Sequence, residues 1–169
     1  AICRRLAREG CIVGVLDRNV DAAHETVDAI TRAGGKAVAS HTDIIDHAAV
    51  ALAVAAFEAD TGPVDILVNN AGWGRFRNFL DTDPAFWDEV IGINLRGPLN
   101  MLHAVLAGMA ARGSGCVISI ASDAGRVGSS GESVYSACKG GIIALTKTLA
   151  REQARHGIRL NAVCPGPTD

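Results

Sequence analysis

Aromatic residues, clustered basic residues and long apolar runs are all scarce in this chain of 169 residues. Aromatic side chains make up 4% of the sequence, which is too few for a platform that stacks nucleic-acid bases. The formal net charge is −2 and no run of lysine or arginine occurs, so the sequence offers no basic surface for nucleic acid or a membrane. Each longer apolar stretch is interrupted by Gly, Asp or Arg before it could cross a bilayer. We therefore expect neither nucleic acid nor a membrane as a partner.

The cysteines and histidines also lack the spacing of disulfides or metal ligands. Five cysteines lie far apart with no C-x-x-C pair, which is typical of free thiols in a reducing compartment. Five histidines show no ligand spacing either. The first ten residues contain three arginines and a glutamate, unlike a secretory signal. We therefore expect a cytoplasmic protein without a metal site.

Short apolar segments alternate with helical segments along the chain. Buried strands are predicted at 11–16, 36–40, 64–68, 116–120 and 158–163. Helices are predicted at 1–9, from Asn19 or Asp21 to 33, at 46–60, at 84–111 and at 134–156, with a polar, glycine-rich loop at 122–133. No linker or internal repeat divides the sequence. The pattern predicts an α/β fold, with residues 1–169 forming one domain around a Rossmann-type, doubly wound parallel sheet that helices cover on both faces.

Polar and small residues follow the predicted strands, at the edge where open parallel sheets bind ligands. They are Asp17, Asp43, Asn69-Asn70-Ala71-Gly72, Ala121-Ser122 and Pro165-Gly166. Turn residues are common at strand ends in any case, but that alternative explains the glycines better than it explains Ser122. We expect ligands to bind at this edge.

Asp17 closes the first of these strands and indicates a particular cofactor. In dinucleotide-binding folds an acidic residue about 20 residues after the glycine-rich fingerprint binds the ribose 2′-hydroxyl. Counting back that far from Asp17 passes the start of the sequence, so we expect the first strand and its glycine-rich turn to be absent from this chain. The carboxylate would repel a 2′-phosphate, which favours NAD over NADP, although Arg18 beside it weakens that preference.

Tyr135, the only tyrosine, lies four residues before Lys139 on one face of a predicted helix. Moving hydride between an alcohol and nicotinamide also requires a group that takes or returns the hydroxyl proton. A free phenol loses its proton only near pH ~10, but an adjacent ammonium and the cofactor's positive ring would stabilise the phenolate. Ser122, thirteen residues before the tyrosine, would hold the substrate oxygen against the phenol. The alternative is a core tyrosine with a surface lysine.

Asn94 is a fourth candidate, within the predicted helix at 84–111. Pro98, four residues later, has no N–H to donate to the carbonyl oxygen of Asn94. We hypothesise that this oxygen holds a water that passes protons on from Lys139. A simply kinked helix is the alternative.

These motifs resemble those of the short-chain dehydrogenase/reductase family along nearly the whole chain. Residues 69–72 match the family's NNAG motif, and 165–166 match its PG motif. The resemblance implies a catalytic tetrad of Asn94, Ser122, Tyr135 and Lys139. It also implies contacts to the NAD cofactor from Asp17, Asp43, Ile44, Asn70, Ala71, Gly72, Tyr135, Lys139, Pro165, Gly166 and Thr168.

Two parts of the family pattern have no counterpart in the sequence. The T-G-x-x-x-G-x-G turn is absent, and the chain stops where the family's substrate-binding helices begin. We therefore expect a chain truncated at both ends, which could be inactive alone. The family usually forms tetramers through two long helices, here those at 84–111 and 134–156, so a homotetramer is expected of the full-length protein.

Within the family, five segments together resemble the 2-hydroxycyclohexanecarboxyl-CoA dehydrogenases, which oxidise a secondary alcohol beta to a CoA thioester with NAD. These segments are 64–73, 120–123, 134–141, 149–156 and 163–169. One alternative is an NADP-dependent 3-oxoacyl-acyl-carrier-protein reductase, and another is a nucleotide-binding module without catalysis. An arginine near the expected substrate region could meet a carboxylate or a CoA phosphate, or simply belong to a solvated loop. The arginines are Arg75 and Arg77, which follow the NNAG motif together with Trp73 and Phe76, and Arg126 in the loop before Tyr135.

Overall fold

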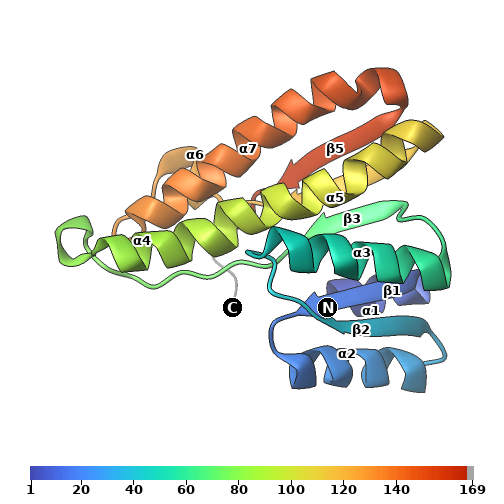
Figure 1. Cartoon of the computed structure of the whole chain (residues 1–169). Helices are drawn as coiled ribbons and strands as arrows, with labels where there is room; N and C mark the ends of the chain where they lie inside the picture. Colours follow the sequence, from blue (N-terminus) through green and yellow to red (C-terminus); the bar gives the residue numbers. More distant parts are fainter. Residues whose placement is uncertain (167–169) are drawn as a thin grey trace. The chain divides into compact units, whose positions relative to one another are not determined.

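Every strand pair among the described residues is parallel, as the alternating pattern predicts. The computed structural model describes residues 1–166, and Figure 1 traces two compact units, Ala1–Pro63 (the N-terminal unit) and the residues from Val64 onward (the C-terminal unit). The first contains a two-stranded sheet, and the second a three-stranded sheet in the order β3-β4-β5. The strands are β1 (Ile12–Asp17), β2 (Lys36–His41), β3 (Ile66–Asn69), β4 (Gly115–Ile120) and β5 (Ile158–Val163).

Helices cover both faces of the sheet in the N-terminal unit. They are α1 (Ile2–Arg8), α2 (Val20–Arg32) and α3 (His47–Thr61). Because side chains alternate along a strand, Val13 and Val15 share one face of β1, and there they join the core residues of α1 and α2. Gly14 faces the other way, toward α3, and a Cβ on it would lie 3.0 Å from the Phe57 ring. This unit therefore matches the prediction of a sheet covered on both sides.

Side-chain caps set the helix starts in this unit. Asn19 Oδ1 accepts a hydrogen bond from the Ala22 amide at 3.1 Å, so Asn19 rather than Asp21 caps α2. Asp46 Oδ1 accepts from the Ala48 and Ala49 amides at 2.9 and 3.1 Å. Both helices start where these residue types predict.

The two faces of the sheet in the C-terminal unit differ in burial. Leu67, Val117 and Leu160 are buried on one face, while Ile66 and Val163 on the other are 42% and 47% exposed. The helical segments are η1 (Phe79–Asp81), α4 (Pro84–Ile91), η2 (Gly92–Arg96), α5 (Gly97–Arg112), α6 (Ala124–Val127), α7 (Ser133–Gln153) and η3 (Ala154–His156). Successive strands are added in one direction, so right-handed crossovers carry the long helices to the same face, where α7 packs on α4 and η2. Both long helices of this unit therefore lie on one face of its three-stranded sheet.

The helix predicted at 84–111 contains a π-helical segment, η2, between α4 and α5. Its last hydrogen bond runs from the Gly97 amide to the Gly92 carbonyl oxygen. Pro98 follows in the first turn of α5, where its missing N–H does no harm. The sequence predicts a kinked helix or a free carbonyl oxygen at Asn94. In the structure the helix instead widens into one π-helical turn at this point. The loop predicted at 122–133 also contains a short helix, α6, that the sequence did not indicate.

Candidate active site

Asp17 and Asp43 lie at the carboxyl ends of the two paired strands of the N-terminal unit. The Thr42 amide donates to the Asp17 carbonyl oxygen at 3.0 Å, which holds the two strand ends together. Each acid accepts a hydrogen bond from an amide two residues later, Asp17 from Asn19 and Asp43 from Ile45. Both acids are exposed. They are therefore available to the hydroxyls of a bound nucleoside, with the half-buried Ile44 beside them.

Lys139 is a buried lysine in α7, which excludes the alternative of a surface residue. It is 4% exposed, and its Nζ donates to the Ile120 carbonyl oxygen at the end of β4, at 2.8 Å. Nζ also lies 5.5 Å from the centroid of the Tyr135 ring. Burial lowers the pKa of Lys139, and the thiol of Cys138 beside it only partly opposes this effect. The helix spacing thus brings the phenol and the ammonium together, as predicted.

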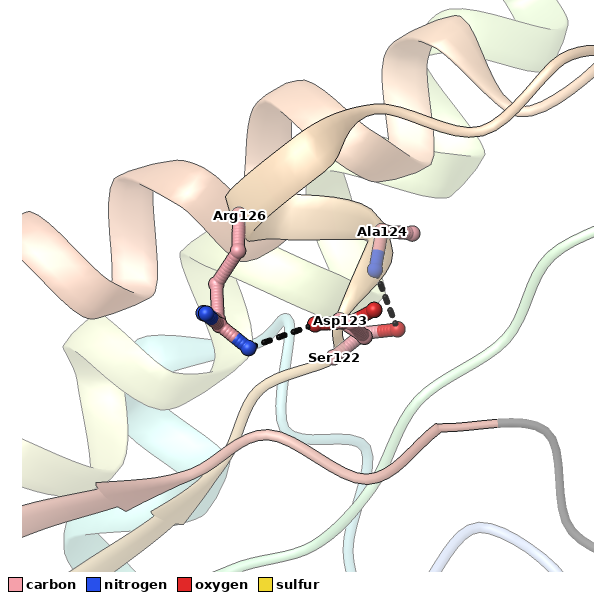
Figure 2. Close-up of polar contacts among 4 residues, drawn as sticks. All are labelled: Ser122, Asp123, Ala124 and Arg126. Carbon is pink, nitrogen blue, oxygen red and sulfur yellow. Dashed lines mark hydrogen bonds and ion pairs between the residues drawn. The ribbon is translucent and has the colours of Figure 1, made fainter.

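Ser122 follows β4 and is fixed to the backbone around it. Its Oγ accepts a hydrogen bond from the Ala124 amide at 3.2 Å (Figure 2). The amides on either side of it, those of Ala121 and Asp123, donate to the carbonyl oxygens of Val163 and Pro165 at 2.8 and 2.9 Å. Ser122 therefore occupies the shared carboxyl edge of β4 and β5, where the sequence predicts it.

Two glycines let α6 lie directly on the backbone of α7, next to Lys139. A Cβ on Gly125 would lie only 2.6 Å from the Lys139 carbonyl carbon, and a Cβ on Gly140 would lie 3.2 Å from the Gly125 carbonyl oxygen. This close approach connects the segment that carries Ser122 to the helix that carries Tyr135 and Lys139. The sequence predicts only a polar, glycine-rich loop at 122–133 and does not indicate this contact.

Asn94 is fully buried in η2, and its side chain binds the loop that follows β3. Its Oδ1 accepts from the Trp73 amide at 3.2 Å, and its Nδ2 donates to the carbonyl oxygens of Trp73 and Val90 at 2.6 and 2.9 Å. The sequence indicates a role only for the Asn94 carbonyl oxygen. It does not indicate that the Asn94 side chain binds the loop after β3. The water relay from Lys139 stays a hypothesis.

The end of β3 fits the ribose of a nicotinamide nucleotide. Asn70, Ala71 and Gly72 are exposed. A Cβ on Gly72 would lie 3.2 Å from Asn94 Oδ1 and 3.3 Å from Lys139 Nζ, so the absence of a side chain lets both groups lie close to the Gly72 backbone. Hydroxyl groups suit such a set of amide, carbonyl and ammonium partners. Pro165 and Gly166 lie at the same edge after β5, and Thr168 lies outside the described residues.

Free thiols and possible metal ligands are further reactive side chains among residues 1–166. All five cysteines are free thiols, and burial raises the pKa of Cys138 despite the Lys139 ammonium. Among residues 1–166, no three or more His, Cys, Asp or Glu side chains gather as metal ligands. None of the helices in this part of the chain is long and apolar enough to span a membrane.

Known proteins resemble this chain in both sequence and structure. The family model for short chain dehydrogenase matches residues 1–169. Nodulation protein G of Azospirillum brasilense is 42% identical over 167 residues, covering 98% of this chain and 68% of that protein. Acetoacetyl-CoA reductase of Rhizobium meliloti (strain 1021) is 48% identical over 124 residues, covering 73% of this chain and 52% of that protein.

Solved structures of a dehydrogenase and a reductase also resemble this chain. NAD+-bound xylitol dehydrogenase superposes with a TM-score of 0.94 at 34% identity, covering 97% of this chain and 64% of that one. A 3-ketoacyl-ACP reductase from Sinorhizobium meliloti 1021 superposes with a TM-score of 0.93 at 36% identity, covering 97% and 66%. The chain thus spans about half to two thirds of the length of these proteins. The predicted Rossmann-type α/β fold is confirmed, and the chain belongs to the short-chain dehydrogenase family.

Proposed function

We propose that the full-length protein is an NAD-dependent oxidoreductase that interconverts a secondary alcohol and a ketone. The observation that carries this proposal is the buried ammonium of Lys139, held by the Ile120 carbonyl oxygen beside the ring of Tyr135. A fixed cation next to a phenol favours the phenolate and so prepares it to exchange a proton with a substrate hydroxyl.

Each residue of the site has a proposed task in that exchange. Tyr135 takes the hydroxyl proton in oxidation and returns it in reduction, and Lys139 stabilises the phenolate between these steps. Ser122 donates a hydrogen bond to the substrate oxygen and keeps it against the phenol. Asn94 positions the loop at Trp73 through its side chain, and its carbonyl oxygen holds the water that passes protons on from Lys139.

NAD, when bound, would accept or supply the hydride, and the chain's residues would bind and orient it. We propose that Asp17, Asp43 and Ile44 hold the adenosine half. The nicotinamide half would be held by Asn70, Ala71, Gly72, Tyr135, Lys139, Pro165, Gly166 and Thr168. The Asp17 carboxylate supports NAD over NADP because it would repel a 2′-phosphate, and the likeness to an NAD+-bound dehydrogenase agrees.

The proposed substrate is a hydroxyacyl-CoA with the alcohol beta to the thioester, similar to 2-hydroxycyclohexanecarboxyl-CoA. Similarity to an acetoacetyl-CoA reductase, at 48% identity, supports a CoA thioester whose ketone lies at that position. The second candidate is an NADP-dependent 3-oxoacyl-acyl-carrier-protein reductase, favoured by the likeness to a 3-ketoacyl-ACP reductase.

Steady-state turnover of the full-length protein tests the proposal. We expect NAD-linked oxidation of 2-hydroxycyclohexanecarboxyl-CoA or another 3-hydroxyacyl-CoA, and loss of that oxidation in Tyr135→Phe. A strong preference for NADPH and an acyl-carrier-protein thioester would select the second candidate. A nucleotide-binding module without catalysis would bind NAD but turn over no member of a broad alcohol panel.

The oligomeric state is a further part of the proposal. We propose a homotetramer that forms through α4–α5 and α7. Support comes from Ile91 and Leu99, apolar residues of α4 and α5 that are 40% and 39% exposed. Light scattering coupled to size-exclusion chromatography should give four chains for the full-length protein, and a monomer would contradict this part.

A further inference from the structure

A small hollow lies beside Tyr135, between the loop after β3 and the start of α7. Its lining includes Gly74, Arg75 and Arg77 from the loop and Glu132 and Tyr135 from the start of the helix. It is a small, partly open hollow and not a cavity that could enclose a whole ligand. Gly74 borders the ring of Tyr135, since a Cβ there would lie 3.3 Å from Cδ2. The arginines that line the hollow therefore lie close to the ring of Tyr135.

Arg77 is held in a defined orientation at this hollow. Its amide donates to the Gly131 carbonyl oxygen at 2.9 Å, which ties the loop to the segment before α7. Its guanidinium lies over the Phe86 ring, 5.3 Å from the centroid. Phe86 in turn packs against Trp73, with ring centroids 6.0 Å apart. An arginine supported on an aromatic face keeps its N–H edge free for a planar anion.

The charges around the hollow are unbalanced. Neither Arg75 nor Arg77 has an ion pair with a carboxylate of residues 1–166. Arg126, the third arginine near the site, differs, because its Nη1 binds Asp123 Oδ1 at 2.8 Å (Figure 2). Glu132 lines the hollow without pairing with either arginine, so two positive groups face one negative group.

We propose that Arg77, assisted by Arg75, binds an anionic group of the substrate, either a carboxylate close to the reacting carbon or a phosphate of a CoA thioester. Guanidinium groups hold both kinds of anion with two parallel hydrogen bonds. The inference rests on the proposed function, because Tyr135 places the reacting oxygen beside the hollow. It adds to that function a charge requirement on the substrate.

Two matched pairs of ketones test the inference on the full-length protein. Acetoacetate and its methyl ester differ in a nearby carboxylate, whereas acetoacetyl-CoA and acetoacetyl-N-acetylcysteamine differ in remote phosphates. We expect Arg77→Met to lower kcat/KM at least tenfold for the charged member of one pair and to leave its neutral partner within about twofold, as for a lost charged hydrogen bond. The pair that responds identifies the source of the anion.

Binding gives a readout separate from turnover, since ligands near Phe86 should change the fluorescence of Trp73. Arg77→Lys should restore part of the affinity, and Glu132→Gln should raise it by removing the opposing charge. Arg151→Met, at an exposed arginine in the last turn of α7, is the matched control. It should change neither kcat/KM nor the affinity for the charged compounds relative to their neutral partners.

Equal losses for charged and neutral ketones, or no loss for either, would overturn the inference. A failure of the proposed function would look different. In that case no turnover would depend on Tyr135, whether or not the charged compounds still bound through Arg77.

Discussion

The two units position their functional residues in opposite ways. In the N-terminal unit, Asp17 and Asp43 are exposed, and each carboxylate binds an amide only two residues further along the chain. In the C-terminal unit, Lys139 and Asn94 are buried, and their side chains bind backbone 19 and 21 residues away. The two acids proposed to bind the cofactor are therefore held by local contacts at strand ends. Lys139 and Asn94 instead depend on packing between segments that are distant in the sequence. Substitutions in the second group should therefore affect stability and chemistry together.

Asn94→Ala should have the largest effect on stability. It removes three hydrogen bonds, two to the part-buried backbone of Trp73 and one to the buried Val90 carbonyl oxygen. We expect the free energy of unfolding to fall by about 2–4 kcal/mol, measured by urea denaturation, together with a clear loss of kcat. Asn78→Ala, at an exposed asparagine, is the control and should stay within about 0.5 kcal/mol. If the Asn94 variant were as stable as this control, the hydrogen bonds of the Asn94 side chain would not stabilise the fold.

Gly125→Ala should separate α6 from α7. The new Cβ would meet the Lys139 backbone at 2.6 Å, and backbone cannot move aside as a flexible side chain can. We expect a loss of about 1–3 kcal/mol in the free energy of unfolding, and a lower kcat because Ser122 shifts with α6.

Gly141→Ala, in α7 two residues after Lys139, is the control. Its Cβ would contact Leu95 at an ordinary 3.5 Å, so helix propensity should leave this variant as stable as wild type or up to about 1 kcal/mol more stable. If both alanine variants behaved alike, the close contact at Gly125 would not matter.

Lys139 should make stability depend on pH in the alkaline range. Burial lowers its pKa below the ordinary 10.5, so between these two values the unfolded chain binds more protons than the folded chain. Stability contributed by this group therefore rises as pH increases toward 10.5 and is constant above it. Denaturation of wild type and Lys139→Met across this range should show a rising difference that favours wild type. A constant difference would mean that burial does not affect the ionisation of Lys139.

Asp17→Asn should have the smallest effect on stability and a specific effect on the cofactor. Asparagine keeps an oxygen that can accept from the Asn19 amide, so the free energy of unfolding should change by less than about 0.5 kcal/mol. Loss of the charge should raise KM for NAD and reduce the preference for NAD over NADP. Asp28→Asn, in α2 and remote from the strand ends, should change neither constant. An unchanged cofactor preference in Asp17→Asn would contradict the proposed role of Asp17.

The same contrast explains what the sequence could predict. The caps at Asn19 and Asp46, the alternation of strands and helices and the pairing of Tyr135 with Lys139 all depend on neighbours within a few residues. Such short-range relations are visible in a sequence pattern. The family and its fold followed from these motifs and are confirmed.

Features that depend on contacts between distant segments were missed. Nothing local indicates that the Asn94 side chain binds Trp73, or that Gly125 lies on the backbone of Lys139. The π-helical segment is an intermediate case: Pro98 signals an irregular turn, but not which geometry accommodates it. The placement of both long helices on one face of the sheet in the C-terminal unit depends on strand order, which hydrophobic patterns do not encode.

The most direct test of the account is a comparison of kcat and KM for NAD between Tyr135→Phe and Asp17→Asn of the full-length protein. We expect Tyr135→Phe to lower kcat by about 10²–10⁴-fold and to change KM for NAD little, because only the proton-transferring group is lost. We expect the reverse for Asp17→Asn, a higher KM with kcat nearly unchanged. A Tyr135→Phe enzyme that retains its kcat would contradict the account.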